Sequence, residues 1–265
     1  YELPAYHWQL EALAFFDHLL YGADNGYASQ ARVRYWRQGA GTYRSAADWP
    51  LPESTPLRLY LVSDGADTAT HRLTPELATG GLNRWAAVPP GATVTAGFDE
   101  VANQSLAFEM PIEEKMELTG PVTVSLAFSS NEIDSHIVAR TGVVAADGTY
   151  WILSMGMIRP ACRRIDETRS TATEIAIDID TPEPLVPGVL VTLRFSLTPQ
   201  PVVLRRGERF RLDIGSRTDL LRSDVSHGYA QFDMQVPPYF ARNAVHYGKD
   251  SFVEMRRLTK IASPR

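Results

Sequence analysis

The sequence predicts a mainly β protein, an antiparallel β-sandwich of the jelly-roll type that follows a single helix. Two observations predict this fold. After Gly26 the apolar residues change from spacings of three and four to alternation, which is the period of a half-buried strand. The connections between the alternating segments carry Gly, Pro, Asn and Asp and show no helical pattern. This favours two antiparallel sheets with Greek-key crossovers over a parallel α/β sheet.

The first element is an apolar helix over residues 7–20. Its large apolar residues recur at spacings of about three and four, and they are Trp8, Leu10, Leu13, Phe15, Phe16, Leu19 and Leu20. A helix this apolar needs a partner, and no second helix is predicted in residues 1–27. We therefore expect residues 1–27 to be the last helix and linker of another domain, and residues 28–265 to form the jelly roll.

The body of the chain contains ten alternating segments that we expect to be strands. They are residues 31–38, 57–63, 104–110, 122–130, 136–145, 150–159, 174–180, 189–197, 209–216 and 251–258. The pair Asp147-Gly148 tolerates positive φ, so residues 146–149 are expected to form a tight hairpin turn. Residues 64–103 have few apolar residues in register, and we expect a long surface excursion with one or two short strands.

Composition excludes several classes of partner and cofactor. The formal net charge is −5 and the basic residues are scattered, so we expect no nucleic-acid partner. No apolar run approaches the roughly 20 residues of a membrane helix, so we expect no membrane partner. The single cysteine, Cys162, allows no internal disulfide, and we expect it to be a small buried side chain. The histidines lack metal-ligand spacing, so we expect no metal and no cofactor.

Catalytic motifs are missing from the sequence. No serine has the glycines of G-x-S-x-G, and neither the phosphate-binding G-x-x-x-x-G-K-[ST] pattern nor H-E-x-x-H occurs. The sequence does not exclude a glycosidase with paired carboxylates, because the two carboxylates need only be close in space. With 31 acidic residues in the chain, this possibility has almost no specificity. We therefore expect no catalytic residue in this chain.

Two groups of residues have both a functional and a structural interpretation. Asp134 and His136 stand two apart, on one face of an extended segment, and form either an acid–base couple or a turn-capping Asp followed by an edge histidine. Four tryptophans could form a sugar-stacking platform or belong to the core and rim of the sandwich. They are Trp36, Trp49, Trp85 and Trp151. For both groups we favour the structural interpretation.

Several stretches resemble one known family. "ALAFFDHLLYGADNGY", residues 12–27, resembles the segment that leaves the α/β-hydrolase domain of CocE/NonD-type hydrolases, the group of cocaine esterase, α-amino-acid ester hydrolases and X-prolyl dipeptidyl-peptidases. Residues 31–65, with Trp49-Pro50 and Gly65, are similar to the stretch that follows in the family. "MELTGPVTVSLAFSSNEIDSHIVARTGVVAADGTYWILSMGMIRPACR" and "LRRGERFRLDIGS" are similar to two later stretches. The resemblance covers residues 12–258.

The resemblance implies a galactose-binding-domain-like jelly roll that forms the non-catalytic C-terminal domain of a serine esterase or X-prolyl dipeptidyl-peptidase. In the family the nucleophile, acid and histidine lie upstream, in the α/β-hydrolase domain. That domain would be the partner of the helix, and this domain would buttress its substrate cleft. The residues expected at the domain interface or facing the cleft are Phe15, Phe16, Leu19, Leu20, Asp134 and His136.

A second function is a free-standing carbohydrate-binding module, because jelly rolls host many of these. The apolar helix discriminates the two, since a free-standing module has no need of it. An uncovered apolar helix also allows self-association, so a homo-oligomer is a further expected partner arrangement.

Overall fold

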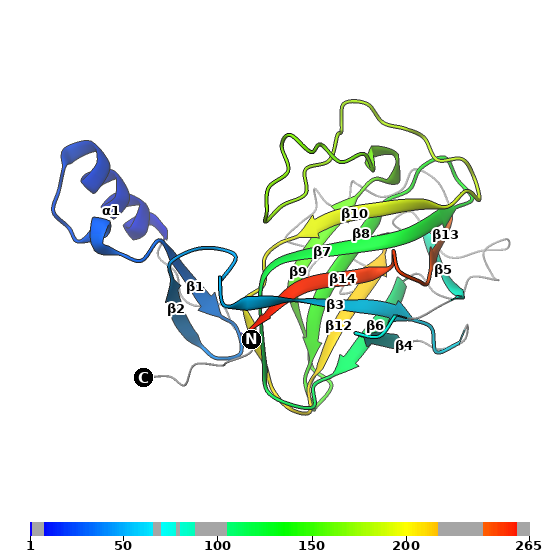
Figure 1. Cartoon of the computed structure of the whole chain (residues 1–265), viewed down its shortest axis with the longest axis horizontal. Helices are drawn as coiled ribbons and strands as arrows, with labels where there is room; N and C mark the ends of the chain where they lie inside the picture. Colours follow the sequence, from blue (N-terminus) through cyan, green and yellow to red (C-terminus); the bar gives the residue numbers. More distant parts are fainter. Residues whose placement is uncertain (2–7, 66–69, 78–79, 88–104, 217–240, 259–265) are drawn as a thin grey trace.

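The computed structural model describes residues 1, 8–65, 70–77, 80–87, 105–216 and 241–258. Within these residues the chain is mainly β, with one α-helix at its beginning, as the sequence predicts (Figure 1). The helices are α1 (Trp8–Tyr21) and the short 3-10 turns η1 (Tyr27–Ser29) and η2 (Pro160–Cys162). The strands are β1 (Val33–Arg37), β2 (Thr42–Ala46), β3 (Ser54–Val62), β4 (Thr70–Thr74), β5 (Leu82–Ala87), β6 (Ser105–Pro111), β7 (Met116–Ser130), β8 (Ile137–Val144), β9 (Tyr150–Ile158), β10 (Val191–Leu197), β11 (Val202–Leu204), β12 (Arg209–Gly215), β13 (Ala241–His246) and β14 (Phe252–Leu258).

The strands form a sandwich of two layers. The paired order is β5-β13-β7-β14-β3-β4-β6-β12-β8-β9, and β10 and β11 pair with β7. In Figure 1 the layer with β10, β7, β14 and β3 crosses in front of the layer with β9, β8, β12 and β6. The β3–β4 pairing covers only Tyr60–Val62 and Arg72–Thr74, and it joins the two layers. Every pairing of the large sheet is antiparallel except β4 with β6, so this sheet is mixed.

The strand β7 is the spine of the front layer. It has 15 residues, and both of its edges are occupied. Residues 123–125 pair with β10 on one edge and with β14 on the other. At its beginning Leu118 pairs with Val202 of β11, and at its end Ser130 pairs with Asn243 of β13. At about 3.3 Å per residue, these two ends lie about 40 Å apart.

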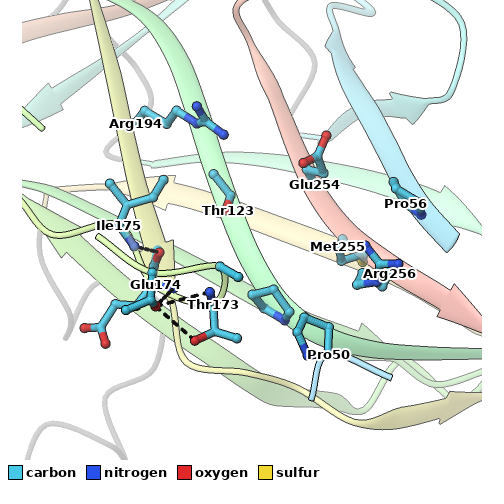
Figure 2. A pocket seen from close by; sticks show the side chains of 14 residues that line it. Pro50, Pro56, Thr123, Thr173, Glu174, Ile175, Arg194, Glu254, Met255 and Arg256 are labelled. Atoms are coloured by element: carbon cyan, nitrogen blue, oxygen red, sulfur yellow. Dashed lines mark hydrogen bonds between the residues drawn. The ribbon is translucent and has the colours of Figure 1, made fainter. Parts of the chain in front are cut away.

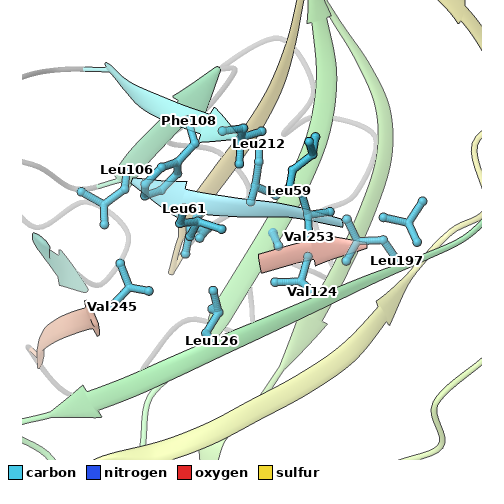
Figure 3. Packing of buried hydrophobic residues seen from close by; sticks show 14 of the residues in the cluster. Leu59, Leu61, Leu106, Phe108, Val124, Leu126, Leu197, Leu212, Val245 and Val253 are labelled. Carbon is cyan, nitrogen blue, oxygen red and sulfur yellow. The ribbon is translucent and has the colours of Figure 1, made fainter. Parts of the chain in front are cut away.

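One apolar core fills the space between the layers (Figure 3). Alternation sends Leu59 and Leu61 of β3 inward, where they lie beside Phe108 of β6 and Leu212 of β12. In β7 the inward residues Val124 and Leu126 are fully buried. Burial of a side chain of this size contributes about 1.5–3 kcal/mol, so this core is the main source of stability.

A hairpin, β1–β2, connects the helix to the sandwich. Gln38 forms a bridge with Val202, and Gly39 lies so close to β11 that a Cβ there would be 2.4 Å from the Val203 carbonyl oxygen. Gly39 also has a φ of 76°, which favours glycine. Both requirements explain a glycine at this contact.

A buried ion pair fixes the hairpin to β7. Arg37 donates from Nε to Glu117 Oε1 at 3.0 Å and from Nη2 to Oε2 at 2.6 Å. Both side chains are almost fully buried, and the hydrogen bonds to Glu117 raise the pKa of Arg37. A second small core of Tyr35, Leu51 and Leu258 lies beside it. The hairpin is therefore rigidly attached to the sandwich.

Several sequence predictions of local structure are confirmed. Nine of the ten predicted strands are present, and the turn at residues 146–149 closes with Ala145 N donating to Thr149 O at 2.8 Å. The described part of the excursion at 64–103 contains two short strands, β4 and β5; residues 66–69, 78–79 and 88–103 lie outside the described residues. The strands β2, β11 and β13 were not predicted.

The predicted strand at 174–180 was wrong. Only an isolated bridge between Ile165 and Ile177 forms there. The Asp178 carboxylate accepts from the N–H groups of Asp180 and Thr181 at 2.9 and 3.2 Å, which turns the chain locally. The N–H of Ile175 donates to a side chain, Ser196 Oγ, at 2.8 Å. Side chains therefore replace the strand ladder in this segment.

We expect Glu117→Gln to destabilise the protein by about 3 kcal/mol, because it leaves the buried Arg37 guanidinium without its charged partner. Glu53→Gln is the matched control, since Glu53 pairs with Arg44 at 2.6 Å but is half exposed, and it should cost less than about 1 kcal/mol. Urea unfolding measures both. Equal stability of the two variants would show that the buried pair does not hold the hairpin.

Candidate functional site

The helix α1 exposes most of its large apolar side chains. Their exposed fractions run from 36% at Phe15 to 82% at Tyr21, and the others are Leu10, Leu13, Phe16, Leu19 and Leu20. Figure 1 shows α1 beyond the hairpin, away from both layers of the sandwich. Its contacts are local: the Phe15 ring lies 5.5 Å from that of Tyr27, and Glu11 pairs with Arg34. The helix is therefore outside the sandwich.

The large apolar residues cover about two thirds of the circumference of α1, and Glu11 and His18 lie on the remaining side. At 100° per residue, Leu10 and Tyr21 share one side, Phe15 and Leu19 lie roughly opposite, and Leu13 and Leu20 lie between. A surface helix has one apolar stripe, whereas a helix that is apolar all round is buried within a domain. The apolar surface of α1 is wider than such a stripe, which is typical of a helix that another domain covers over most of its circumference.

Asp134 acts as a turn cap in this structure. Its Oδ2 accepts from Arg159 Nε at 3.0 Å and Nη2 at 2.6 Å, while Oδ1 accepts from the N–H groups of Ser135 and Ala161 at 2.9 and 3.0 Å. These contacts fasten the loop before β8 to η2, with Asp134 only 8% exposed. The contacts match the capping interpretation of the sequence.

His136 is a buried, uncharged residue. It is 5% exposed, and burial lowers its pKa to about 4, with a further lowering by the positive charge of Arg159. Asp134 and a hydrogen bond to the Ser216 backbone act in the opposite direction and raise this pKa. A histidine that is neutral near pH 7 and enclosed by protein serves packing better than proton transfer.

Polar side chains around His136 connect four strands. Asn243 Nδ2 donates to Ser135 Oγ at 2.9 Å and to Ser216 Oγ at 3.2 Å, and Trp85 Nε1 donates to Ser216 Oγ at 2.9 Å. Asn243 lies in β13 and Trp85 in β5, whereas Ser216 follows β12 directly and Ser135 lies two residues before β8. The network fixes the end of the sandwich at which β7 terminates.

The structure does not bring all the predicted site residues together. Phe15, Phe16, Leu19 and Leu20 belong to the helix beyond the hairpin, which contacts the beginning of the sandwich spine through Gln38 and β11. Asp134 and His136 follow the other end of β7. About 40 Å of strand separates these two ends. Their shared place in a domain interface stays a prediction, and burial leaves Asp134 and His136 little surface for direct contact.

The four tryptophans do not form one platform. Trp85 is fully buried in the core, and Trp151 lies 6.4 Å from the Tyr1 ring. Trp36 stacks edge-on with Tyr43, whereas its neighbour Tyr35 packs against Trp49. Since adjacent strand residues point to opposite faces, Trp36 and Trp49 lie on opposite sides of the hairpin.

One serine–histidine pair, with the side chains of a nucleophile and a base, was not predicted from the sequence. Ser129 Oγ lies 2.9 Å from His246 Nε2, across β7 and β13. Within the described residues no carboxylate holds the other nitrogen of His246, and both residues sit inside strands rather than at the turn of a nucleophile elbow. We interpret this pair as a cross-strand hydrogen bond on the sheet surface. Ser129 and His246 are 117 positions apart, and no pattern in the sequence indicates that the two residues lie side by side in the sheet.

Two further features concern the described residues, clusters of metal-ligating side chains and long apolar helices. No three His, Cys, Asp or Glu side chains there are grouped so as to hold a metal ion. Among the same residues, no helix has the length and apolar character needed to cross a membrane. Cys162 is buried, as expected from the sequence.

A family model, the X-Pro dipeptidyl-peptidase C-terminal non-catalytic domain, matches residues 25–249. The chain belongs to this family. It is 28% identical to cocaine esterase from Rhodococcus sp. over 211 residues, which are 69% of this chain and 37% of that protein. The resemblance to the C-terminal domain of CocE/NonD-type hydrolases is thereby confirmed.

Solved structures share the fold. A CocE/NonD family hydrolase from Staphylococcus aureus matches with a TM-score of 0.72 and 16% identity, over 95% of this chain and 45% of that chain. An α-amino acid ester hydrolase matches with a TM-score of 0.64 and 17% identity, over 93% of this chain and 44% of that chain. The chain thus spans less than half the length of each of these relatives.

We expect the protein to lose stability as the pH falls from about 6.5 to about 4. The unfolded chain, with a histidine pKa near 6.5, takes up a proton over this range that folded His136, with a pKa of about 4, does not. His136 accounts for at most about 3 kcal/mol of this loss, and its contribution levels off below pH 4.

His136→Gln should make this pH dependence shallower, because the residue that titrates is gone. Urea unfolding at several pH values between about 4 and 7 measures the slope in both proteins. His71 and His246, whose pKa values are also lowered by burial, contribute equally to both and cancel in the comparison. An unchanged slope would show that His136 is not buried in its neutral form.

Proposed function

We propose that this chain is the non-catalytic C-terminal domain of a serine hydrolase of the esterase or X-prolyl dipeptidyl-peptidase type, and that it packs against the α/β-hydrolase domain and buttresses its substrate cleft. The observation that carries the proposal is α1, whose large apolar side chains are exposed over most of its circumference. The partner domain encloses this helix. Membership of a family described as non-catalytic supports the same conclusion.

The attachment of the hairpin supports a buttressing role. A domain can support a neighbouring cleft only if the two are joined by a rigid connection. The Arg37–Glu117 pair holds the hairpin on β7, the close contact at Gly39 holds it on β11, and Arg34 of the hairpin pairs with Glu11 of α1. The enclosed helix thereby fixes the position of the sandwich relative to the hydrolase domain.

A free-standing carbohydrate-binding module is the weaker candidate. The aromatic residues that a sugar platform needs are distributed over the core, the two faces of the hairpin and β9. An uncovered apolar helix also has no purpose in such a module.

The chain by itself should not hydrolyse p-nitrophenyl esters or X-Pro dipeptide substrates above background, because it has no nucleophile elbow. Release of p-nitrophenol is measured before and after repurification. Turnover that persists and is abolished by a serine-directed inhibitor would place catalysis in this chain and contradict the proposal.

Replacing Phe16 and Leu20 together by Ser should reduce both self-association and the binding of an apolar dye by the chain, because this change removes exposed apolar surface from α1. Sedimentation and dye fluorescence measure the two effects.

The matched control for this double variant is Val186→Ser with Leu190→Ser, which replaces two similarly exposed apolar residues outside α1. It should change association less than the α1 variant does. Unchanged association and dye binding in a folded Phe16/Leu20 variant would show that α1 is covered by its own chain.

A further inference from the structure

The polar side of α1 lies against its own chain. Glu11 and His18 occupy the part of the helix circumference, about a third, that carries no large apolar residue. Glu11 pairs with Arg34 of β1, and His18 Nδ1 lies 3.1 Å from the carbonyl oxygen of Ala23 in the linker. The linker and the hairpin therefore cover the polar third of α1 and leave its apolar surface to a partner.

The two faces of the β1–β2 hairpin differ. Tyr35 and Arg37 point to the sandwich, where they belong to the second small core and to the buried ion pair. Adjacent strand residues point to opposite faces, so Arg34 and Trp36 lie on the outer face, together with Tyr43, which pairs with Trp36 across the strands. An antiparallel pair that has water on its outer face commonly carries polar residues there.

The outer face of this hairpin carries an aromatic pair instead. The rings of Trp36 and Tyr43 lie edge to face, with centroids 5.0 Å apart, and the Arg34 guanidinium lies 5.3 Å from the centroid of the Tyr43 ring. Tyr43 is 44% exposed. Trp, Tyr and Arg are the residue types most enriched among those that dominate the binding energy of protein interfaces. We call Arg34, Trp36 and Tyr43 the aromatic face.

The aromatic face adjoins the uncovered surface of α1. Arg34 contacts both parts, because it pairs with Glu11 of the helix and lies over the ring of Tyr43. Around the helix, Glu11 is only about 40° from Phe15, where the apolar surface begins. A domain that covers the apolar surface of α1 therefore ends beside Arg34, and the aromatic face is the next surface that it meets.

We propose that the aromatic face is a second contact of the α/β-hydrolase domain, so that α1 and the hairpin form one continuous interface. This proposal rests on the proposed function, because the domain that covers α1 is also the occupant here. Trp36 and Tyr43 contribute apolar ring surface to the contact. Arg34 already has an acidic partner in Glu11, so the surface that fits on the opposite side is apolar and uncharged.

The pocket on the outer face of the front layer is a weaker candidate for an interaction (Figure 2). Its lining holds two arginines, Arg194 and Arg256, and two glutamates, Glu174 and Glu254, so its charge is balanced. Arg256 already donates from Nε to Ser54 Oγ at 2.7 Å. Unlike the aromatic face, this lining does not favour one class of partner.

Hydrogen exchange in the hairpin tests the proposal. Amide exchange of residues 42–46 is measured by mass spectrometry in this chain alone and in the chain joined to the α/β-hydrolase domain. Exchange should be at least about tenfold slower in the joined protein, because opening the hairpin would then also expose the covered rings. The reference is β13, residues 241–246, at the other end of β7, which should exchange equally in the two proteins.

This proposal and the proposed function fail in different ways. Slower exchange in residues 8–21 without slower exchange in residues 42–46 would overturn the contact at the aromatic face and leave the proposed function in place. Equal exchange of both segments in the two proteins would contradict both proposals. Equal slowing of β13 would indicate general stabilisation instead of a contact. Exchange of residues 42–46 that slows as the chain alone is concentrated would assign the aromatic face to a second copy of this chain. Either of these last two results would also overturn the proposal.

Tyr43→Ser should lower the melting temperature of the joined protein by about 2–4 °C more than that of the chain alone, because the ring loses its interdomain contact only in the joined protein. Tyr60→Ser is the matched control. Tyr60 also lies edge to face with an aromatic ring, that of Phe252, but on the front layer, and its replacement should lower both melting temperatures equally. Equal shifts for Tyr43→Ser in the two proteins, or an excess shift for Tyr60→Ser in the joined protein, would contradict a contact at Tyr43.

Discussion

The buried ion pair between Arg37 and Glu117 joins the two parts of this protein. Glu117 lies at the beginning of β7, the strand with both edges occupied, and Arg37 ends β1 of the hairpin that leads to α1. Two charges without solvent are stable only with good mutual geometry, so the pair fixes where the hairpin lies. The position of the apolar helix relative to the sandwich follows from this contact and from the close packing at Gly39.

The sequence predicted what depends on period and local turn chemistry. The alternating runs gave most of the core strands, and Asp147-Gly148 gave the hairpin turn. Prediction from the sequence failed where a long-range contact or a side-chain hydrogen bond determines the local structure. Three-residue β11 is a strand only because β7 offers an edge, whereas residues 174–180 alternate but turn at Asp178. Asp134 was correctly favoured as a cap, but its partner Arg159 and the distance from α1 depend on the tertiary fold.

The two ends of the sandwich differ in structure. At the beginning of β7 the hairpin and α1 offer an uncovered apolar surface, which suits attachment to a larger domain. At the end of β7, Asp134, His136 and Asn243 form a buried polar network that fixes the strand ends. A domain that supports a neighbouring domain needs an apolar contact surface at one end and a rigid body behind it.

The most direct test of the central claim is amide hydrogen exchange in residues 8–21, measured by mass spectrometry in this chain alone and in the same chain joined to the α/β-hydrolase domain that we propose as its partner. Enclosure of α1 should slow exchange in the joined protein by about a hundredfold or more, because opening the helix would then also expose the apolar surface that the domain covers. Equal exchange in the two proteins would contradict the account.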